Sequence, residues 1–431
     1  MINIFWFRRD LRLLDNHGLW QALNAGLPVL PVFIFDSEIL DKLNSKSDAR
    51  VQFIHEQLKH IQFQLQQKGK SLLVLSGKPM DVFKQLTEKY QIANIFTNSD
   101  YEPYGIQRDN LIKTLLNKAD IGFKSFKDHV IFDPLEVLKA DGKPYTVYTP
   151  YSRKWKEKLL PQHTKPFHSE SLLDNLLSDY FELPNLEEIG MMPSPVFVPP
   201  IKLDDKRLQS YHETRNFPAL TGTSLAGPHL RFGTIGIRHV VDIALHTNET
   251  YLNELIWREF FMQILYHFPK TVTHNFYSKY DPLEWKNNPE EFQAWCDGKT
   301  GYPLVDAGMR ELLATGNMHN RVRMVVASFL TKHLLIDWRW GEAWFASKLL
   351  DFELSSNVGN WQWAAGTGCD AAPYFRVFNP SEQIKKFDKY LTYVRKWVPE
   401  LEEFRYPKPI IEHSFARDRA ISAYKKALSG L

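Results

Sequence analysis

The sequence has almost no cysteine, no long apolar run and no strong excess of either charge. Only Cys296 and Cys369 are cysteines among 431 residues, and they lie far apart and in no CxxC pair. We therefore expect neither a structural disulfide nor a zinc site. No stretch approaches the ~18 apolar residues of a membrane span, and the N-terminal MINIFWFRRD lacks the apolar core of a secretory signal. These absences predict a cytoplasmic protein with no membrane partner.

The two common phosphate-binding fingerprints are also missing. The apolar run at residues 2–7 is followed by RRDLR rather than by GxGxxG, and SGKP at residues 76–79 lacks the Walker spacing. The net charge of +3 is only mildly basic. A surface for nucleic acid would therefore have to be a local one.

The first 130 residues alternate short apolar runs with amphipathic stretches. The predicted strands are residues 2–7, 29–35, 71–75, 93–97 and 122–126, and the clearest predicted helices between them are residues 48–67, 80–90 and 103–118. This alternation predicts a doubly wound parallel sheet with helices on both faces. A ligand of such a domain would lie at the carboxyl ends of the strands.

The rest of the chain divides at about residue 205. Residues 131–204 are rich in proline and weakly periodic, which predicts an interdomain linker. Residues 205–431 predict an all-α domain, with helices at 237–245, 252–266, 290–297, 305–315, 321–335, 342–350, 381–397 and 416–428.

The densest cluster of polar and aromatic residues is the block at residues 351–380. It contains the carboxylates of Asp351 and Glu353, the amide of Asn357 and the indoles of Trp361 and Trp363. The 12 tryptophans of the chain would serve either core packing or stacking against bases or a flavin. Because each buried polar group needs a partner, this block favours a site for a large, flat, polar-edged ligand.

Two predicted helices carry further candidates. Glu254 and Trp257 are three residues apart and share a face, which suits either a surface ion pair beside a core indole or a site for a base. Asn320 and Arg323 fall within one turn, and Arg323 could pair with a carboxylate such as that of Asp351.

Two weaker signals lie nearby. His319 has no second His or Cys at ligand spacing, so a structural histidine is expected and a metal is not. The turn-rich segment at residues 222–228, with Tyr211 before it, offers hydroxyls and free N–H groups that can hold phosphate, although such loops are common.

In this order, the segments resemble the photolyase/cryptochrome family, and most of all its bacterial class I cyclobutane pyrimidine dimer photolyases. The motifs that carry the resemblance are FWFRRDLRLLDN, GTSLAGPHLRFG, ELIWREF, GYPLVDAGMREL, TGNMHNRVRM, LLIDWRWGE and the block at 351–380. The resemblance implies an α/β domain joined by a long linker to a helical FAD-binding domain. It also implies a deoxyribodipyrimidine photo-lyase, a carbon–carbon lyase that repairs DNA damage with blue light.

The resemblance further implies which residues serve the flavin. Those that would bind FAD are Tyr211, Thr223, Ser224, Arg323, Asp351, Glu353 and Asn357, and those that would pass electrons inward to it are Trp361, Trp338 and Trp285. Fully reduced, light-excited FAD would donate an electron to the substrate. A second, antenna chromophore stays open between a deazaflavin, a flavin, a folate and none, and Tyr104 stands where folate-binding members carry Glu.

The implied partner is DNA that contains pyrimidine dimers, bound by a monomer. The pocket for the flipped-out dimer would be lined by Glu254, Trp257, Asn320, Met324 and Trp363, and the DNA backbone would be bound by Arg321 and Arg376. Flipping costs a few kcal/mol, and least for a lesion that is already distorted.

A cryptochrome-like blue-light photoreceptor with little or no repair activity is the alternative. Asn357 favours a photolyase, because plant and animal cryptochromes commonly place Asp or Cys there, and Asn320 and Met324 stand where six-four photolyases carry His. Three residues depart from the family pattern, namely Glu353, Gly227 and Asn317, where Asp, Ser and Trp are usual.

Overall fold

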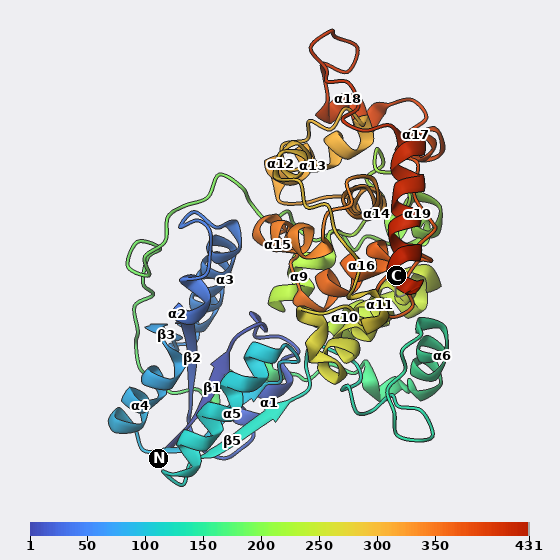
Figure 1. The fold of residues 1–431 in the computed structure, drawn as a ribbon. Coiled ribbons are helices and arrows are strands. Elements are labelled where there is room, and N and C mark those ends of the chain that lie inside the picture. Colours follow the sequence, from blue (N-terminus) through green and yellow to red (C-terminus); the bar gives the residue numbers. More distant parts are fainter. Residues whose placement is uncertain (430–431) are drawn as a thin grey trace. The chain divides into compact units, whose positions relative to one another are not determined.

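The structure, a computed structural model, describes residues 1–429 (Figure 1). The chain forms two compact units. An α/β unit comprises Met1–Leu138, Lys154–Ile201 and Leu225–His246, and a helical unit comprises Lys139–Arg153, Lys202–Ser224 and Thr247–Leu431. Both units therefore draw on the segment that the sequence predicts as a linker, and the expected domain limits at residues 130 and 204 stay a prediction.

The α/β unit is built on one parallel sheet of five strands, in the order β3-β2-β1-β4-β5. The strands are β1 (Ile2–Phe7), β2 (Val29–Asp36), β3 (Leu73–Gly77), β4 (Ile92–Asn98) and β5 (Gly122–Phe126). Every predicted strand is confirmed within two residues at each end, because buried apolar runs between turn residues identify such strands well.

Helices cover both faces of this sheet. The helices that pack on it are α1 (His17–Leu23), α2 (Ser37–Leu40), α3 (Ala49–Gln66), α4 (Pro79–Lys89) and α5 (Pro103–Asn117). The unit also contains α9 (Ala226–Phe232) and most of α10 (Ile237–Thr247). Alternate residues of β1 point to opposite faces: Phe5 packs in the core with Leu58 of α3, and Trp6 packs in the core with Phe83 of α4. The predicted doubly wound sheet is confirmed.

The helical unit contains no strand among its described residues. Its α-helices are α7 (Asp205–Gln209), α8 (Tyr211–Thr214), α11 (Glu249–His267), α12 (Pro289–Cys296), α13 (Pro303–Thr315), α14 (Asn320–Ser328), α15 (Trp338–Lys348), α16 (Leu354–Ala365), α17 (Pro380–Phe387), α18 (Thr392–Trp397) and α19 (His413–Ser429). Helix α6 (Tyr148–Lys158) begins in this unit. The predicted all-α character is confirmed.

Two predicted helices are interrupted in the structure. The helix expected at residues 321–335 is α14 followed by a π-helical turn, η5 (Phe329–His333). The helix expected at 381–397 is α17 and α18, separated at Leu391, whose φ of 57° is left-handed. Asp388 caps the second of them, because its carboxylate accepts hydrogen bonds from the backbone N–H groups of Tyr393 and Val394.

Helix α16 is one of the helices that the periodicity did not predict, and it lies in the block at residues 351–380. Its buried positions follow helical spacing, but three of the seven, Ser355, Asn357 and Gln362, are polar. No helix among residues 1–429 is long and apolar enough to cross a membrane.

Candidate functional site

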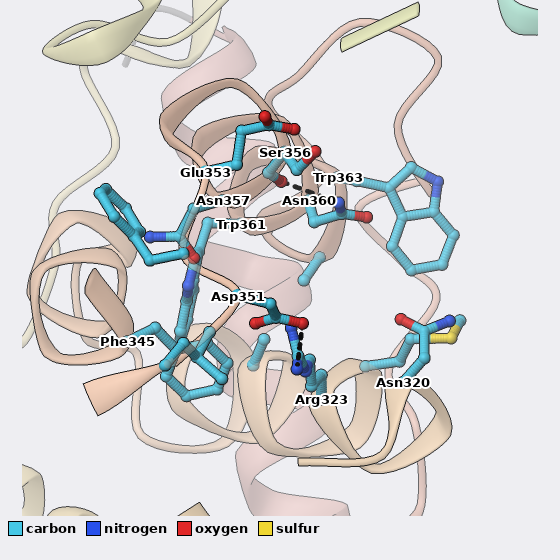
Figure 2. Close-up of a pocket in the computed structure, with 15 residues that line it drawn as sticks. Asn320, Arg323, Phe345, Asp351, Glu353, Ser356, Asn357, Asn360, Trp361 and Trp363 are labelled. Atoms are coloured by element: carbon cyan, nitrogen blue, oxygen red, sulfur yellow. Dashed lines mark hydrogen bonds and ion pairs between the residues drawn. The ribbon is translucent and has the colours of Figure 1, made fainter. Parts of the chain in front are cut away.

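Two adjoining cavities lie in the helical unit. The first is lined by Asn320, Arg323, Met324, Ala327, Phe345, Leu349, Asp351, Phe352, Glu353, Ser356, Asn357, Asn360, Trp361, Trp363 and Ala364. The second is lined by Arg215, Glu254, Trp257, Arg258, Phe261, Asn320, Met324, Ser356, Asn360 and Trp363. Figure 2 shows the first cavity, with Trp361 and Phe345 on one side and Trp363 and Asn320 on the other. The five residues common to both linings make the cavities neighbours.

Helix α16 lines both cavities, and two neighbouring helices pack closely against it. At Gly359, an added Cβ would lie 2.2 Å from a ring carbon of Phe261 on α11. At Gly341 on α15, an added Cβ would lie 2.1 Å from the indole of Trp361. Glycine at these two positions therefore lets α11 and α15 pack directly on the helix that carries Asn357.

The predicted pair of Arg323 and Asp351 is confirmed. Nη2 of Arg323 lies 2.9 Å from Oδ2 of Asp351, and its Nε donates to the carbonyl of Met318 at 2.7 Å. The same guanidinium contacts Asn317, one of the departures from the family pattern, at 3.4 Å. Oδ1 of Asp351 is buried and has no hydrogen-bond partner. A buried carboxylate oxygen calls for a donor, which a ligand in this cavity would supply.

The side chain of Asn357 has a fixed orientation. Its Nδ2 donates to the carbonyl oxygen of Glu342 at 3.0 Å and to the carboxylate Oε1 at 2.8 Å, which leaves the amide oxygen of Asn357 for the cavity. Burial raises the pKa of Glu342, and the hydrogen bond from Asn357 opposes this rise. Nothing in the spacing of Glu342 and Asn357 predicts this contact.

Glu254 and Trp257 both lie on α11 and line the second cavity. The carboxylate of Glu254 forms an ion pair with Arg215, the residue that ends α8. Burial raises the pKa of Glu254, and Arg215 lowers it in part. One face of the Trp257 indole stacks on Tyr148, a residue that no sequence motif singles out.

Helix α14 places Asn320 and Met324 on the wall between the cavities. His319 caps this helix, since its Nδ1 accepts from the backbone N–H of Arg321 at 3.2 Å. Burial, with the positive charges of Arg323, Arg321 and Arg215, lowers the pKa of His319 to about 4. His319 is therefore neutral at pH 7, as expected for a structural histidine.

A cluster of arginines lies beside the second cavity. The guanidinium of Arg321 donates to Oδ1 of Asn216 at 2.6 Å and lies 4.3 Å from the ring centre of Phe387. Burial lowers the pKa of Arg321, and the nearby Arg215 and Arg376 lower it further. The predicted DNA-binding pair, Arg321 and Arg376, therefore belongs to one positive region that also includes Arg215.

The three residues predicted at the FAD phosphates do not line either cavity. Ser224 is buried and accepts a hydrogen bond from the hydroxyl of Tyr251 at 3.0 Å. Tyr211 packs edge-on against the same ring at 5.1 Å. Tyr211, Ser224 and the half-buried Thr223 thus lie by the start of α11, about one turn before Glu254.

The three predicted electron-transfer tryptophans pack against one apolar core. Trp361 lines the first cavity and lies 4.9 Å from Phe345 between ring centres. Trp338 is fully buried and donates to Asn275 at 2.9 Å, whereas Trp285 is only partly buried. Trp361 therefore lies at the first cavity, whereas Trp285 is partly exposed to solvent.

Glu353 is a second residue of this region that departs from the family pattern. It is buried and pairs with Arg258 of α11 at 3.2 Å. Glu353 lines the first cavity and Arg258 the second. Their ion pair therefore joins the walls of the two cavities.

Two family models match the chain. The model of "DNA photolyase" matches residues 3–169, and the model of "FAD binding domain of DNA photolyase" matches residues 251–405. Among curated relatives, the deoxyribodipyrimidine photo-lyase of Halobacterium salinarum is 36% identical over 480 residues and covers 99% of each chain. The enzyme of that name from Synechococcus sp. is also 36% identical, over 98% of this chain and 96% of its own length.

Solved structures of similar fold are photolyases and a cryptochrome. A class III photolyase from Agrobacterium tumefaciens has a TM-score of 0.90 at 35% identity, over 99% of this chain and 98% of its own. A Sulfolobus tokodaii photolyase with two FAD molecules has a TM-score of 0.83 at 32% identity, over 99% and 100% of the two chains. A Synechocystis cryptochrome reaches 0.83 at 25% identity, over 98% and 99%. The expected class I subclass stays a prediction, but the sequence motifs, the fold and both family models agree: the chain belongs to the photolyase/cryptochrome family.

Proposed function

We propose that this protein is a deoxyribodipyrimidine photo-lyase, which splits cyclobutane pyrimidine dimers in DNA under blue light with reduced FAD as cofactor. The observation that carries the proposal is the pair of adjoining cavities. One offers a half-buried ion pair and an oriented amide to a flat heterocycle, and the other offers an indole and a carboxylate to a base. Asn320, Met324 and Trp363 line both.

The first cavity fits the ring system of a flavin. The unpartnered Oδ1 of Asp351 is an acceptor for a ring N–H, and Arg323 fixes the carboxylate through its other oxygen. Asn357, held by Glu342, directs its amide oxygen to the cavity. Glu353 would complete this set, and Tyr211, Thr223 and Ser224 would hold the phosphates and ribityl chain. When bound and fully reduced, FAD supplies the light-driven electron.

The second cavity suits the flipped-out dimer. Trp257 and Trp363 offer apolar ring faces to its bases, as aromatic side chains do for unstacked bases. Glu254 and Asn320 offer a carboxyl group and an amide to the base edges. Because Arg215 already holds Glu254 in place, this carboxyl group needs little reorganisation when the dimer enters.

The arginine cluster would bind the DNA backbone. Arg215 and Arg376 lie close enough to Arg321 to lower its pKa. The three arginines therefore place positive charge beside the second cavity. Such contacts make affinity fall steeply with salt. Trp361, Trp338 and Trp285 would carry electrons inward to reduce oxidised FAD.

We further propose a monomer that works in the cytoplasm, where the free buried cysteines Cys296 and Cys369 would stay reduced. A second chromophore is also proposed, without a choice among deazaflavin, flavin and folate; the Sulfolobus relative is described with two FAD molecules. The complete set of side chains in the second cavity favours repair over a purely signalling photoreceptor.

The test is illumination of the FAD-loaded, pre-reduced protein with an oligonucleotide that contains one thymine dimer, followed by chromatography of the DNA. We expect loss of the dimer in blue light and none in the dark. A dimer that survives saturating light would contradict the proposal and would favour the photoreceptor.

A further inference from the structure

The indole of Trp257 packs against three aromatic rings, one of them stacked on its face. Tyr148 lies parallel to it, with ring centres 3.7 Å apart and an angle of 4° between the planes. Phe260 meets it edge-on at 5.6 Å, and Phe261 lies 5.5 Å away at 31°. Trp257 lines the second cavity even with these rings against it, so part of the indole is accessible to a ligand.

Tyr148 is itself held at several points. Its hydroxyl donates to the backbone carbonyl of Asn253 at 2.9 Å, on the same helix as Trp257. Its backbone N–H donates to Oδ2 of Asp370 at 3.0 Å, and its ring meets Phe260 edge-on at 5.9 Å. Burial, and then the charge of Glu254, raise the pKa of Tyr148 to about 12, so the hydroxyl keeps its proton at neutral pH.

These contacts restrict the motion of the indole. A parallel ring at 3.7 Å blocks rotation of the Trp257 plane toward Tyr148, and the hydroxyl bond ties Tyr148 to the helix that it supports. The link from Tyr148 to Asp370 also reaches the segment that contains Arg376. Preorganised ring faces lose little freedom when a ligand stacks on them.

We propose that Tyr148 is a positioning residue for lesion recognition: it fixes the Trp257 indole so that its open face receives the flipped base. The inference rests on the proposed function of the second cavity. Tyr148 acts through Trp257, and it therefore contributes to the affinity for DNA with a dimer and not to the affinity for undamaged DNA or to the binding of FAD.

The experiment measures dissociation constants of the FAD-loaded protein in the dark for two oligonucleotides of one sequence, with and without a thymine dimer. The ratio of the two constants reports discrimination. Tyr148→Leu removes the stacked ring, Tyr148→Phe keeps the ring and removes only the hydroxyl, and Tyr390→Leu is a control at a tyrosine that is 78% exposed.

We expect Tyr148→Leu to lower the discrimination ratio about three- to tenfold, the worth of one aromatic pair. Tyr148→Phe should keep most of the wild-type discrimination ratio, and Tyr390→Leu should leave it unchanged. The flavin absorbance and the affinity for undamaged DNA should match wild type in all three variants. Loss of folding stability alone would not produce this pattern, because it would lower the affinities for both oligonucleotides together.

Three results would overturn the inference. They are an unchanged ratio in Tyr148→Leu, an equal loss in Tyr148→Phe and Tyr148→Leu, or a parallel loss of affinity for undamaged DNA. If wild-type protein fails to discriminate at all, the proposed function fails instead, and the two failures are thus distinct.

Discussion

The amide nitrogen of Asn357 is bound by both the backbone carbonyl and the carboxylate of Glu342, at 3.0 and 2.8 Å. Two acceptors on one residue determine which way the amide points, and they aim its oxygen at the cavity. The first prediction concerns this pair. Glu342→Ala leaves a buried donor without its side-chain partner and should lower the free energy of unfolding by about 1–3 kcal/mol.

Urea titration measures this loss. Glu342→Gln is the matched control, because its amide oxygen can still accept from Asn357, and it should cost less than the alanine variant. Equal costs for the two variants would show that the carboxylate oxygen is not the relevant acceptor.

Glu254→Ala tests the second cavity. The substitution removes a hydrogen-bond acceptor for the dimer and leaves Arg215 unpaired. We expect the affinity for a dimer-containing oligonucleotide to fall about three- to tenfold and the repair yield to fall with it, while the flavin spectrum stays intact. Loss of FAD from the variant would instead assign Glu254 to the cofactor.

Trp361→Phe separates two electron-transfer steps. Trp361 lines the cavity assigned to FAD, so its loss should stop the photoreduction of oxidised FAD by an external reductant. Protein that is reduced chemically beforehand should still repair dimers. Absorbance during illumination follows the first step, and Trp397→Phe, in α18 and outside both cavity linings, is the control that should keep both steps.

Lys332 gives a prediction about pH. This buried lysine donates to the carbonyls of Ala365 and Tyr374, at 2.7 and 3.1 Å, and lies 3.8 Å from the ring centre of Tyr424. Burial lowers its pKa from 10.5 to about 7. Below pH 7 the lysine is charged in both the folded and the unfolded chain, so its contribution to the free energy of unfolding does not change.

Between pH 7 and 10.5 the unfolded chain keeps a proton that the folded chain has lost. The contribution of Lys332 to the free energy of unfolding should therefore rise with pH, by up to about 1.4 kcal/mol per pH unit. Urea titrations of wild type and Lys332→Met across pH 6–10 measure it. A difference between the two proteins that stays constant over this range would contradict the prediction.

Local pattern was enough to predict the sheet and most helices, because those elements bury apolar residues at regular spacing. It failed at α16, whose buried face includes Ser355, Asn357 and Gln362. A polar buried face has no hydrophobic period to detect. The interruption at Leu391 was missed for a different reason, since a single left-handed residue between two helical patterns leaves little trace in composition.

Some residues of the candidate site were predictable from the sequence, and others were not. The shared face of Glu254 and Trp257 follows from their spacing, and the pair of Arg323 and Asp351 follows from charge, so both were predictable. The partners that fix these groups were not. Tyr148 and Glu342 look like ordinary residues of their own segments, and their roles arise only when distant parts of the chain pack together.

The cavity proposed for FAD adjoins the cavity proposed for the dimer, and we infer that an electron can pass directly from one to the other. The most direct test is the fluorescence lifetime of reduced FAD in the protein, with a saturating oligonucleotide that does or does not contain a thymine dimer. We predict a clear shortening of the lifetime with the dimer and no change with undamaged DNA. If the bound dimer leaves the lifetime unchanged, the electron does not pass directly between the two cavities.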